Sequence, residues 1–204
     1  KIESDWSDIE LASIPCAYST AENLLERSNV SKGETVLITG SSGGVGSAAI
    51  QLAKRRGATI IAVASEQKIT DVKSIGADHV VEREDNLIDI LGTECVDVVI
   101  DLVAGRKWGE LLEVLKKGGR YAAAGAIAGP IVELDVRTLY LKDLTLMGCT
   151  FQDSHVFENL IGYIEKNEIK PLVAKNYPLK DIIQAQKDFL AKKHVGKLVL
   201  VPPN

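Results

Sequence analysis

The chain has 204 residues, of which 46% are hydrophobic and 25% charged, and its formal net charge is −4. These proportions suit a globular protein with one good core and exclude a largely disordered chain. Because basic residues are interspersed among an excess of acids, neither nucleic acid nor an anionic membrane is expected as the main partner. We expect a small-molecule ligand instead.

The cysteines Cys16, Cys95 and Cys149 are widely spaced and contain no C-x-x-C pair. This spacing fits a reducing compartment and excludes a self-contained four-cysteine zinc module. The longest apolar runs are strand-sized and no signal peptide is visible, so we expect no membrane span and a cytoplasmic protein. Since the chain starts at Lys1 and its one methionine is Met147, we expect it to be the downstream part of a longer protein.

The elements predicted in chain order indicate an α/β fold. Residues 1–31 lie outside the sheet pattern: residues 6–12 mix polar and apolar side chains, and residues 17–27 predict a helix. From residue 32 to 147, short β-branched runs alternate with amphipathic segments, which is typical of βαβ units. Strands are predicted at residues 35–39, 59–64, 79–82, 96–101, 120–124 and 144–147. Helices are predicted around residues 48–54, 69–74, 87–91 and 108–115.

Glycines mark the ends of these elements. Gly57 and Gly76 are expected to close helices, and Gly118-Gly119 to separate a helix from the next strand. With right-handed crossovers, the pattern gives a doubly wound parallel sheet of six strands, a Rossmann sheet. One more helix is predicted at residues 154–166, and runs at 172–174 and 197–201 flank a helix at about 181–191. This tail resembles an appendage to another domain.

A glycine-rich turn follows the first strand of the sheet, with Gly40, Gly43, Gly44 and Gly46 leading into an apparent helix at residues 45–56. Glycine lets the backbone approach phosphates closely, and the first N–H groups of the helix face the anion. The turn therefore predicts a site for a nucleotide diphosphate. It fits the short-chain dehydrogenase fingerprint from Thr39 to Gly46. It also fits a dinucleotide fingerprint in which Ser41 replaces the first glycine.

Two other families with such turns fit poorly. A short-chain dehydrogenase needs a tyrosine with a lysine four residues later, and none of the five tyrosines has one. A methyltransferase usually has an acid at the end of the second strand. Here that strand ends in Val63, Ala64 and Ser65, and the first acid, Glu66, lies just beyond.

The wider sequence, from about residue 9 to 201, resembles the medium-chain dehydrogenase/reductase superfamily, specifically its zinc-type alcohol dehydrogenases and quinone oxidoreductase-like members. The segments that carry the resemblance are Ile14-Pro15-Cys16-Ala17-Tyr18-Ser19-Thr20-Ala21, Gly33-Glu34-Thr35-Val36-Leu37, Gly43-Gly44-Val45-Gly46, Ser74-Ile75-Gly76-Ala77-Asp78 and Gly196-Lys197-Leu198-Val199-Leu200. The resemblance implies a linker with an interdomain helix (residues 1–31) and an NAD(P)-binding Rossmann domain (32–167). Residues 168–204 would return to a largely absent, barrel-like GroES-type catalytic domain.

The same resemblance implies the cofactor site. Gly43, Gly44 and Val45 would cradle the pyrophosphate, with Ser41 in the same turn and Lys197 reaching it from the tail. The nicotinamide would lie near Thr20, Val103, Gly125, Ala126, Cys149, Thr150 and Phe151.

For the adenosine ribose, the position that is acidic in NAD-preferring relatives falls near Ala64. With no carboxylate there to repel it, a 2′-phosphate would be held by Ser65 and Lys68, so we predict NADP(H) over NAD. Two alternatives stay open. One is that Lys68 is only a solvated helix residue, and the other is that Glu66 nearby favours NAD.

Cys16 opens a Cys-x-x-Ser-Thr segment that resembles the one supplying a thiolate to the catalytic zinc of zinc-type alcohol dehydrogenases. A catalytic zinc needs three protein ligands and an open position. His79, His155 and His194 show no ligand spacing with Cys16, so zinc would bind only in the full-length protein. The alternative is a small buried cysteine.

Two functions follow from these expectations. The first is an NADP(H)-dependent oxidoreductase that transfers hydride between nicotinamide and an alcohol, aldehyde, quinone or enone, with this chain as its inactive cofactor-binding part. The second is a non-catalytic NADPH-binding sensor or structural relative. Relatives often dimerise through the sheet edge near residues 144–147, so a homodimer is expected.

Overall fold

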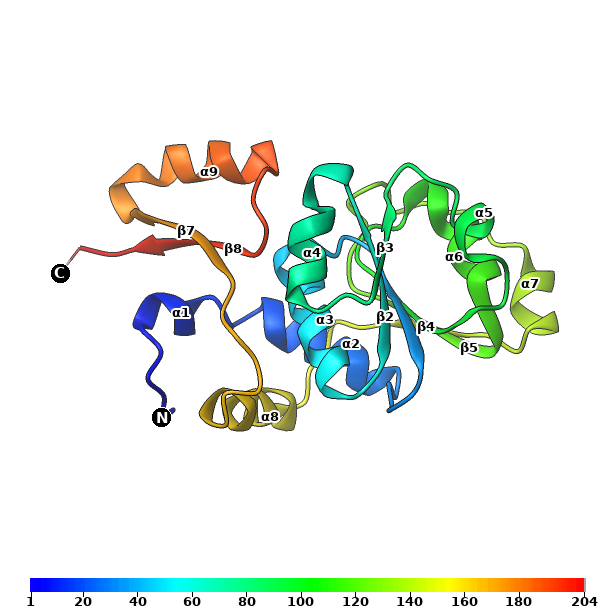
Figure 1. Ribbon diagram of the computed structural model, residues 1–204, viewed down its shortest axis with the longest axis horizontal. Helices are drawn as coiled ribbons and strands as arrows, with labels where there is room; N and C mark the ends of the chain where they lie inside the picture. Colours follow the sequence, from blue (N-terminus) through cyan, green and yellow to red (C-terminus); the bar gives the residue numbers. More distant parts are fainter. Residues whose placement is uncertain (204) are drawn as a thin grey trace.

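A parallel sheet of six strands is the centre of the fold (Figure 1). The computed structural model describes residues 1–203. The strand order is β3-β2-β1-β4-β5-β6, and every neighbouring pair is parallel. The strands are β1 (Thr35–Ile38), β2 (Thr59–Ala64), β3 (His79–Glu82), β4 (Val96–Asp101), β5 (Leu115–Ala123) and β6 (Thr145–Gly148). The predicted doubly wound Rossmann sheet is confirmed.

Helices cover both faces of this sheet. On one face lie α2 (Ala17–Arg27), α3 (Gly44–Arg55) and α4 (Ile69–Ile75), with α8 (Ser154–Glu165) packed against α2. On the other lie α5 (Leu87–Leu91), α6 (Trp108–Val114) and α7 (Val136–Leu141). Short 3₁₀ turns, η1 (Glu66–Lys68) and η2 (Gly105–Lys107), follow β2 and β4.

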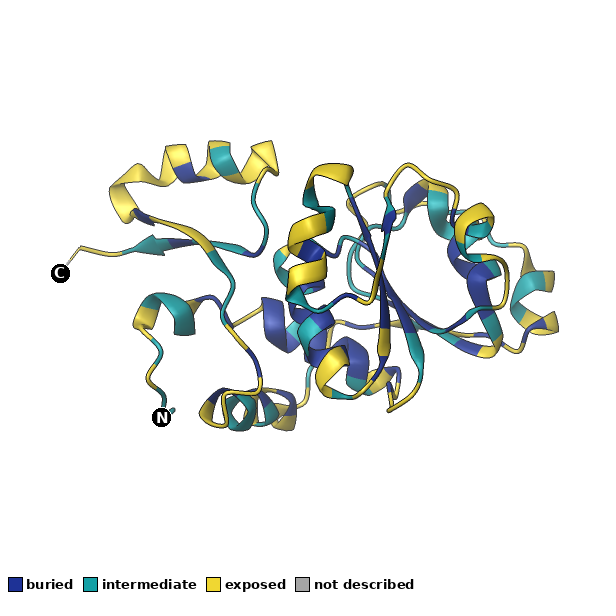
Figure 2. Cartoon of the chain, in the orientation of Figure 1, coloured by how far each residue is buried: buried dark blue, intermediate teal, exposed yellow. Residues whose placement is uncertain are grey.

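The core is divided by the sheet into two clusters. In β1, Val36 and Ile38 face the cluster under α2 and α3, whereas Leu37 faces the cluster under α6. Burial on both faces explains why the strands read as continuous apolar runs rather than alternating ones. Figure 2 shows these buried residues gathered in the strands and in the helices packed on them.

The C-terminal segment forms a separate small unit beside the Rossmann fold (Figure 1). Strands β7 (Val173–Pro178) and β8 (Lys197–Val201) pair in parallel, and η3 (Leu179–Asp181) and α9 (Ile182–Ala191) connect them. The short helix α1 (Asp8–Ala12) contacts both strands. Ile183 and Leu190 on α9 are largely exposed. The division of the chain at residues 31 and 167 stays a prediction.

The sequence did not predict three features of the fold. Strand β5 starts at Leu115, so the prediction that Gly118-Gly119 precedes the strand is wrong. Leu115 pairs with Val96 before a register shift, and the Gly118 N–H donates to the Lys142 carbonyl at 2.7 Å. Helices α1 and α7 are single short turns without a regular apolar stripe. The N-caps Ser7 and Asp135 define where these two helices begin.

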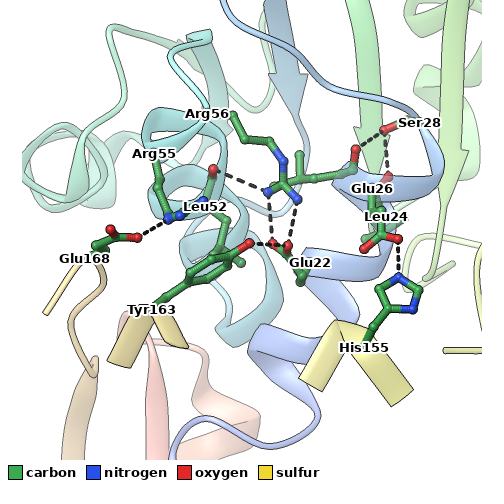
Figure 3. A network of polar contacts seen from close by, with 11 residues as sticks. Glu22, Leu24, Glu26, Ser28, Leu52, Arg55, Arg56, His155, Tyr163 and Glu168 are labelled. Carbon is green, nitrogen blue, oxygen red and sulfur yellow. Dashed lines mark hydrogen bonds and ion pairs between the residues drawn. The ribbon is translucent and has the colours of Figure 1, made fainter. Parts of the chain in front are cut away.

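A polar network joins the helices on the first face (Figure 3). The Glu22 carboxylate of α2 is buried and accepts two hydrogen bonds from the Arg56 guanidinium, at 2.9 and 2.8 Å. The Tyr163 hydroxyl of α8 donates to the same carboxylate at 3.0 Å. The Arg55 guanidinium lies 3.5 Å from the centre of the Tyr163 ring and pairs with Glu168. The network fixes α3, whose other end is the glycine turn.

Candidate functional site

A cavity of about 640 Å³ opens at the carboxyl ends of the strands, beside the point between β1 and β4 where the strand order reverses. Open α/β sheets bind ligands at this place. The turns after β1, β2, β3 and β4, the loop after β5 and the C-terminal segment all line it. Of the predicted residues, Gly43, Gly44, Ser65, Lys68, Val103 and Lys197 line the cavity.

The glycines of the turn have different roles. A Cβ atom on Gly46 would lie 2.6 Å from the Ser41 Cα, so Gly46 is needed for helix α3 to pack against the backbone of the turn after β1. A Cβ on Gly43 would meet only the Gly40 carbonyl oxygen at 3.4 Å, an ordinary contact. Gly43 is the N-cap of α3 with φ −76°, a conformation open to any residue. The packing of the protein therefore does not require glycine at position 43, and the missing side chain leaves space for a ligand.

The C-terminal segment closes over this turn. The Gly196 N–H donates to the Ser42 carbonyl at 3.2 Å. The Cδ of Lys197 lies 2.6 Å from the position of a Cβ on Gly44. Lys197 thus brings a cation to the start of α3, where the helix dipole also favours an anion.

Three cationic side chains form a cluster where β2 and β3 end: Lys68, Arg83 and Lys192. Lys68 Nζ donates to the His194 carbonyl at 2.8 Å and lies 3.5 Å from Ser42 Oγ. Partial burial, followed by the charges of Arg83 and Lys192, lowers the pKa of Lys68. The cluster lies beside Ser65, the N-cap of η1, and all of these residues line the cavity.

Arg83 and Lys192 were not predicted as site residues. The Arg83 N–H donates to the Ala64 carbonyl at 2.7 Å, because β3 pairs with β2 in the sheet. The predicted strand at residues 79–82 ends directly before Arg83, and this position was the sequence signal that pointed to it. No sequence signal pointed to Lys192, since only the folded C-terminal segment brings it near β2.

The turn after β4 is strained. Ala104 has φ 54° and ψ −143°, close to a region that only glycine populates readily. Such a residue costs about 1–3 kcal/mol and is found disproportionately at functional sites. Val103 and Ala104 line the cavity, together with Ile127 and Ala128 from the loop after β5.

The remaining predicted residues lie outside the cavity lining. Ser41 is buried, and its hydroxyl donates to the Val63 carbonyl at 2.7 Å. Cys149 is buried, which raises the pKa of its thiol, whereas Phe151 is 74% exposed. The others not brought to the lining are Thr20, Val45, Gly125, Ala126 and Thr150. Gly125 and Ala126 directly precede the lining residues Ile127 and Ala128.

Cys16 lies in an exposed, strained turn before α2. Its φ of 67° and ψ of −58° accompany a hydrogen bond of 2.9 Å from the Ala17 N–H to the Pro15 carbonyl, a rare γ-turn. Within residues 1–203, no three His, Cys, Asp or Glu side chains gather closely enough to hold a metal ion. The residues present therefore do not make a zinc site by themselves.

The family model for zinc-binding dehydrogenases matches residues 44–166 of the chain. The chain belongs to the zinc-binding dehydrogenase family. This confirms the predicted resemblance to medium-chain dehydrogenases. An acryloyl-coenzyme A reductase from Metallosphaera sedula is 31% identical over 98% of this chain and 60% of its own length.

Two solved structures support the same assignment. A provisionally named alcohol dehydrogenase from Sinorhizobium meliloti 1021 is 50% identical, with a TM-score of 0.95 over 99% of this chain and 57% of that one. The 2-octenoyl-CoA carboxylase reductase CinF, solved with NADP and 2-octenoyl-CoA, is 26% identical. Its TM-score is 0.88 over 97% of this chain and 50% of that one. This zinc-binding dehydrogenase chain spans about 60% of the length of the curated relatives it matches. No helix within residues 1–203 is long and apolar enough to cross a bilayer.

Proposed function

We propose that this chain binds NADP(H) and that the whole protein is an oxidoreductase, which transfers hydride between the nicotinamide and a small substrate. The observation that carries the proposal is the cavity itself. It has a glycine turn at the start of a helix on one side and the cations Lys68, Arg83 and Lys192 on another. A dinucleotide with one extra phosphate matches both features.

The pyrophosphate would lie against Gly43 and Gly44. Their missing side chains leave room for it, the first N–H groups of α3 would donate hydrogen bonds to it, and Lys197 would supply a cation. The 2′-phosphate would lie among Ser65, Lys68 and the two further cations. Arg83 pairs with Glu84 at 3.1 Å and the charge of Asp71 acts on Lys68, yet the positive charges of Arg83 and Lys192 still lower the pKa of Lys68. An anion between the three cations would therefore stabilise the arrangement.

The nicotinamide would lie against Val103 and the loop after β5. NADPH supplies the hydride when bound; this chain orients the cofactor and excludes water from one face of the ring. The substrates we propose are an alcohol or aldehyde, a quinone or an enone. The name of the acryloyl-coenzyme A reductase relative and the ligands of the CinF structure favour an activated alkene.

Catalysis would need the part of the protein outside this chain. We propose that residues 32–167 are the cofactor domain and that residues 1–31 and 168–204 connect it to a catalytic domain. That domain would contribute most of the substrate cleft, and any zinc would bind there together with Cys16. The chain alone would then bind NADPH without turning substrate over. We also propose a cytoplasmic homodimer that pairs through the open edge of β6.

A fluorescence titration of the 204-residue chain with NADPH and with NADH tests the proposal. A charge-assisted hydrogen bond is worth about 1.5–3 kcal/mol, so we expect NADPH to bind at least about tenfold more tightly than NADH. Lys68→Met should remove most of this preference while leaving NADH binding unchanged. Lys73→Met, on the next turn and outside the cavity, is the matched control. Equal binding of both cofactors by the wild type would contradict the NADP(H) assignment. Cofactor binding by the longer protein without turnover of any enone or aldehyde would favour the sensor alternative.

A further inference from the structure

A fully buried carboxylate, that of Asp101, lies at the end of β4 and borders the cavity. Asp101 accepts a hydrogen bond from Thr39 Oγ1 at 2.5 Å and another from the Tyr121 hydroxyl. It also accepts the main-chain N–H of Val103 at 2.9 Å and that of Ala104 at 3.1 Å. All of these donors are neutral. A buried carboxylate is costly unless its lone pairs are satisfied, so this set of contacts serves a local purpose.

The main-chain donors belong to the turn after β4, so the purpose of these contacts is to hold that turn in place. Leu102, Val103 and Ala104 are consecutive, and their three N–H groups all point inward. The Leu102 N–H donates to Thr39 Oγ1 at 2.9 Å, and the other two donate to Asp101. Two side chains, Thr39 and Asp101, therefore hold the whole turn after β4. The turn includes the strained backbone of Ala104.

The turn at residues 102–104 also supports the loop after β5, which forms another wall of the cavity. The Ala128 N–H donates to the Val103 carbonyl at 2.9 Å. A Cβ on Gly105 would lie 2.7 Å from the Ala128 carbonyl oxygen, so the two loops are in close contact. Val103, Ala104 and Ala128 all line the cavity. A shift of the turn would move both loops.

These loops lie on the opposite side of the glycine turn from the cationic cluster. In the strand order β3-β2-β1-β4-β5-β6, the cluster follows β2 and β3, and the two loops follow β4 and β5. A dinucleotide whose pyrophosphate lies at the end of β1 therefore has its adenosine on the first side and its nicotinamide on the second.

We propose that Asp101 is a positioning residue for the nicotinamide half of the cofactor. Its carboxylate, together with Thr39, holds the turn at residues 102–104 in the shape that the nicotinamide and its ribose rest against. Asp101 borders the cavity but is fully buried, so it acts through the turn rather than through contact with the cofactor. The inference rests on the proposed function, since it takes the bound molecule to be NADP(H).

Two probes separate this role from a general effect on the fold. NADPH carries both halves of the cofactor, whereas adenosine 2′,5′-bisphosphate carries only the half that the cationic cluster would bind. Asp101→Asn keeps the size of the side chain but leaves one oxygen to accept hydrogen bonds. We expect it to weaken NADPH binding by about tenfold or more, because misplaced contacts are lost from half of the ligand. The binding of adenosine 2′,5′-bisphosphate should stay within about twofold of the wild type.

Two further variants complete the experiment. Tyr121→Phe is the matched control, because the Tyr121 hydroxyl contacts Asp101 but donates nothing to the turn; it should bind both probes like the wild type. Thr39→Val removes the acceptor for the Leu102 N–H and should repeat the selective loss of NADPH binding, and it serves if Asp101→Asn does not fold. The enhancement of NADPH fluorescence on binding should also fall in both turn variants.

The outcomes are distinct. Selective loss of NADPH binding supports the proposal. Wild-type binding of both probes by Asp101→Asn and Thr39→Val, or equal loss of both probes, would overturn it, because the carboxylate would then be irrelevant or would act on the fold as a whole. A wild-type chain that binds neither probe would overturn the proposed function and this inference with it.

Discussion

Alanine at Gly43 and at Gly46 should have opposite consequences, although the two glycines are three residues apart in one turn. At Gly43 the added methyl group meets no protein atom closer than 3.4 Å, and the backbone conformation is an allowed one. Gly43→Ala should therefore change the free energy of unfolding by less than about 1 kcal/mol, because the lower entropy of the unfolded chain stabilises the variant while alanine is a poorer N-cap than glycine. The methyl group projects into the space that we assign to the pyrophosphate. NADPH binding should weaken by at least about tenfold, which is about 1.4 kcal/mol.

At Gly46 the methyl group would lie 2.6 Å from the Ser41 Cα, and backbone atoms cannot rotate away as a side chain can. Overpacking of this kind costs about 1–3 kcal/mol. For a chain of this length, each kcal/mol lowers the melting temperature by about 2–4 °C. Gly46→Ala should therefore melt earlier than the wild type by about 2–12 °C.

Thermal melting followed by circular dichroism, combined with a fluorescence titration of NADPH, measures both effects on the same preparations. Gly44→Ala is an informative intermediate, because its methyl group would clash only with the flexible Lys197 side chain, while the Ala17 Cβ lies at an ordinary contact distance of 3.5 Å. Wild-type affinity for NADPH in Gly43→Ala would refute the placement of the phosphates on this turn. Wild-type stability in Gly46→Ala would refute the packing role of Gly46.

Three other predictions concern the rest of the molecule. Glu22→Gln leaves the half-buried Arg56 guanidinium without its counter-charge and should lower the free energy of unfolding by about 3 kcal/mol, as measured by urea denaturation; an unchanged midpoint would contradict the role of the network. The hydrogen bond to Glu26 raises the pKa of His155, so this contact should stabilise the fold fully below the unfolded His pKa of about 6.5 and lose its effect as the pH rises through the raised pKa. Melting of the wild type against His155→Gln across this range should show a difference only at the acidic end. Finally, light scattering should give twice the mass of one chain, and Thr145→Pro on the open edge of β6 should yield a monomer; a wild type that is already monomeric would contradict the proposed dimer.

Much of the fold was predictable because parallel strands covered on both faces are continuous apolar runs. The six strands and the doubly wound parallel sheet followed from those runs and from the right-handed crossover rule. The start of β5 was not predictable, since a glycine such as Gly118 usually marks the end of a helix or strand. Only the pairing of Leu115 with Val96 shows that the strand has already begun. Helices α1 and α7 are too short for a periodic pattern to reveal them.

The site was predictable where one local segment builds it. Gly43, Gly44, Ser65 and Lys68 each lie next to the end of a predicted strand, and all four line the cavity. Lys192 comes from the far end of the chain, and its place beside Lys68 depends on tertiary contacts that no spacing encodes. The role proposed for Asp101 was also hidden, because its partners come from the residue after β1, from β5 and from its own turn.

A calorimetric titration of the 204-residue chain with NADPH, repeated with NADH under the same conditions, tests the cofactor assignment most directly. We expect one site per chain that binds NADPH at least about tenfold more tightly than NADH, with the difference lost in Lys68→Met. A chain that binds neither nucleotide, or that prefers NADH, would contradict it.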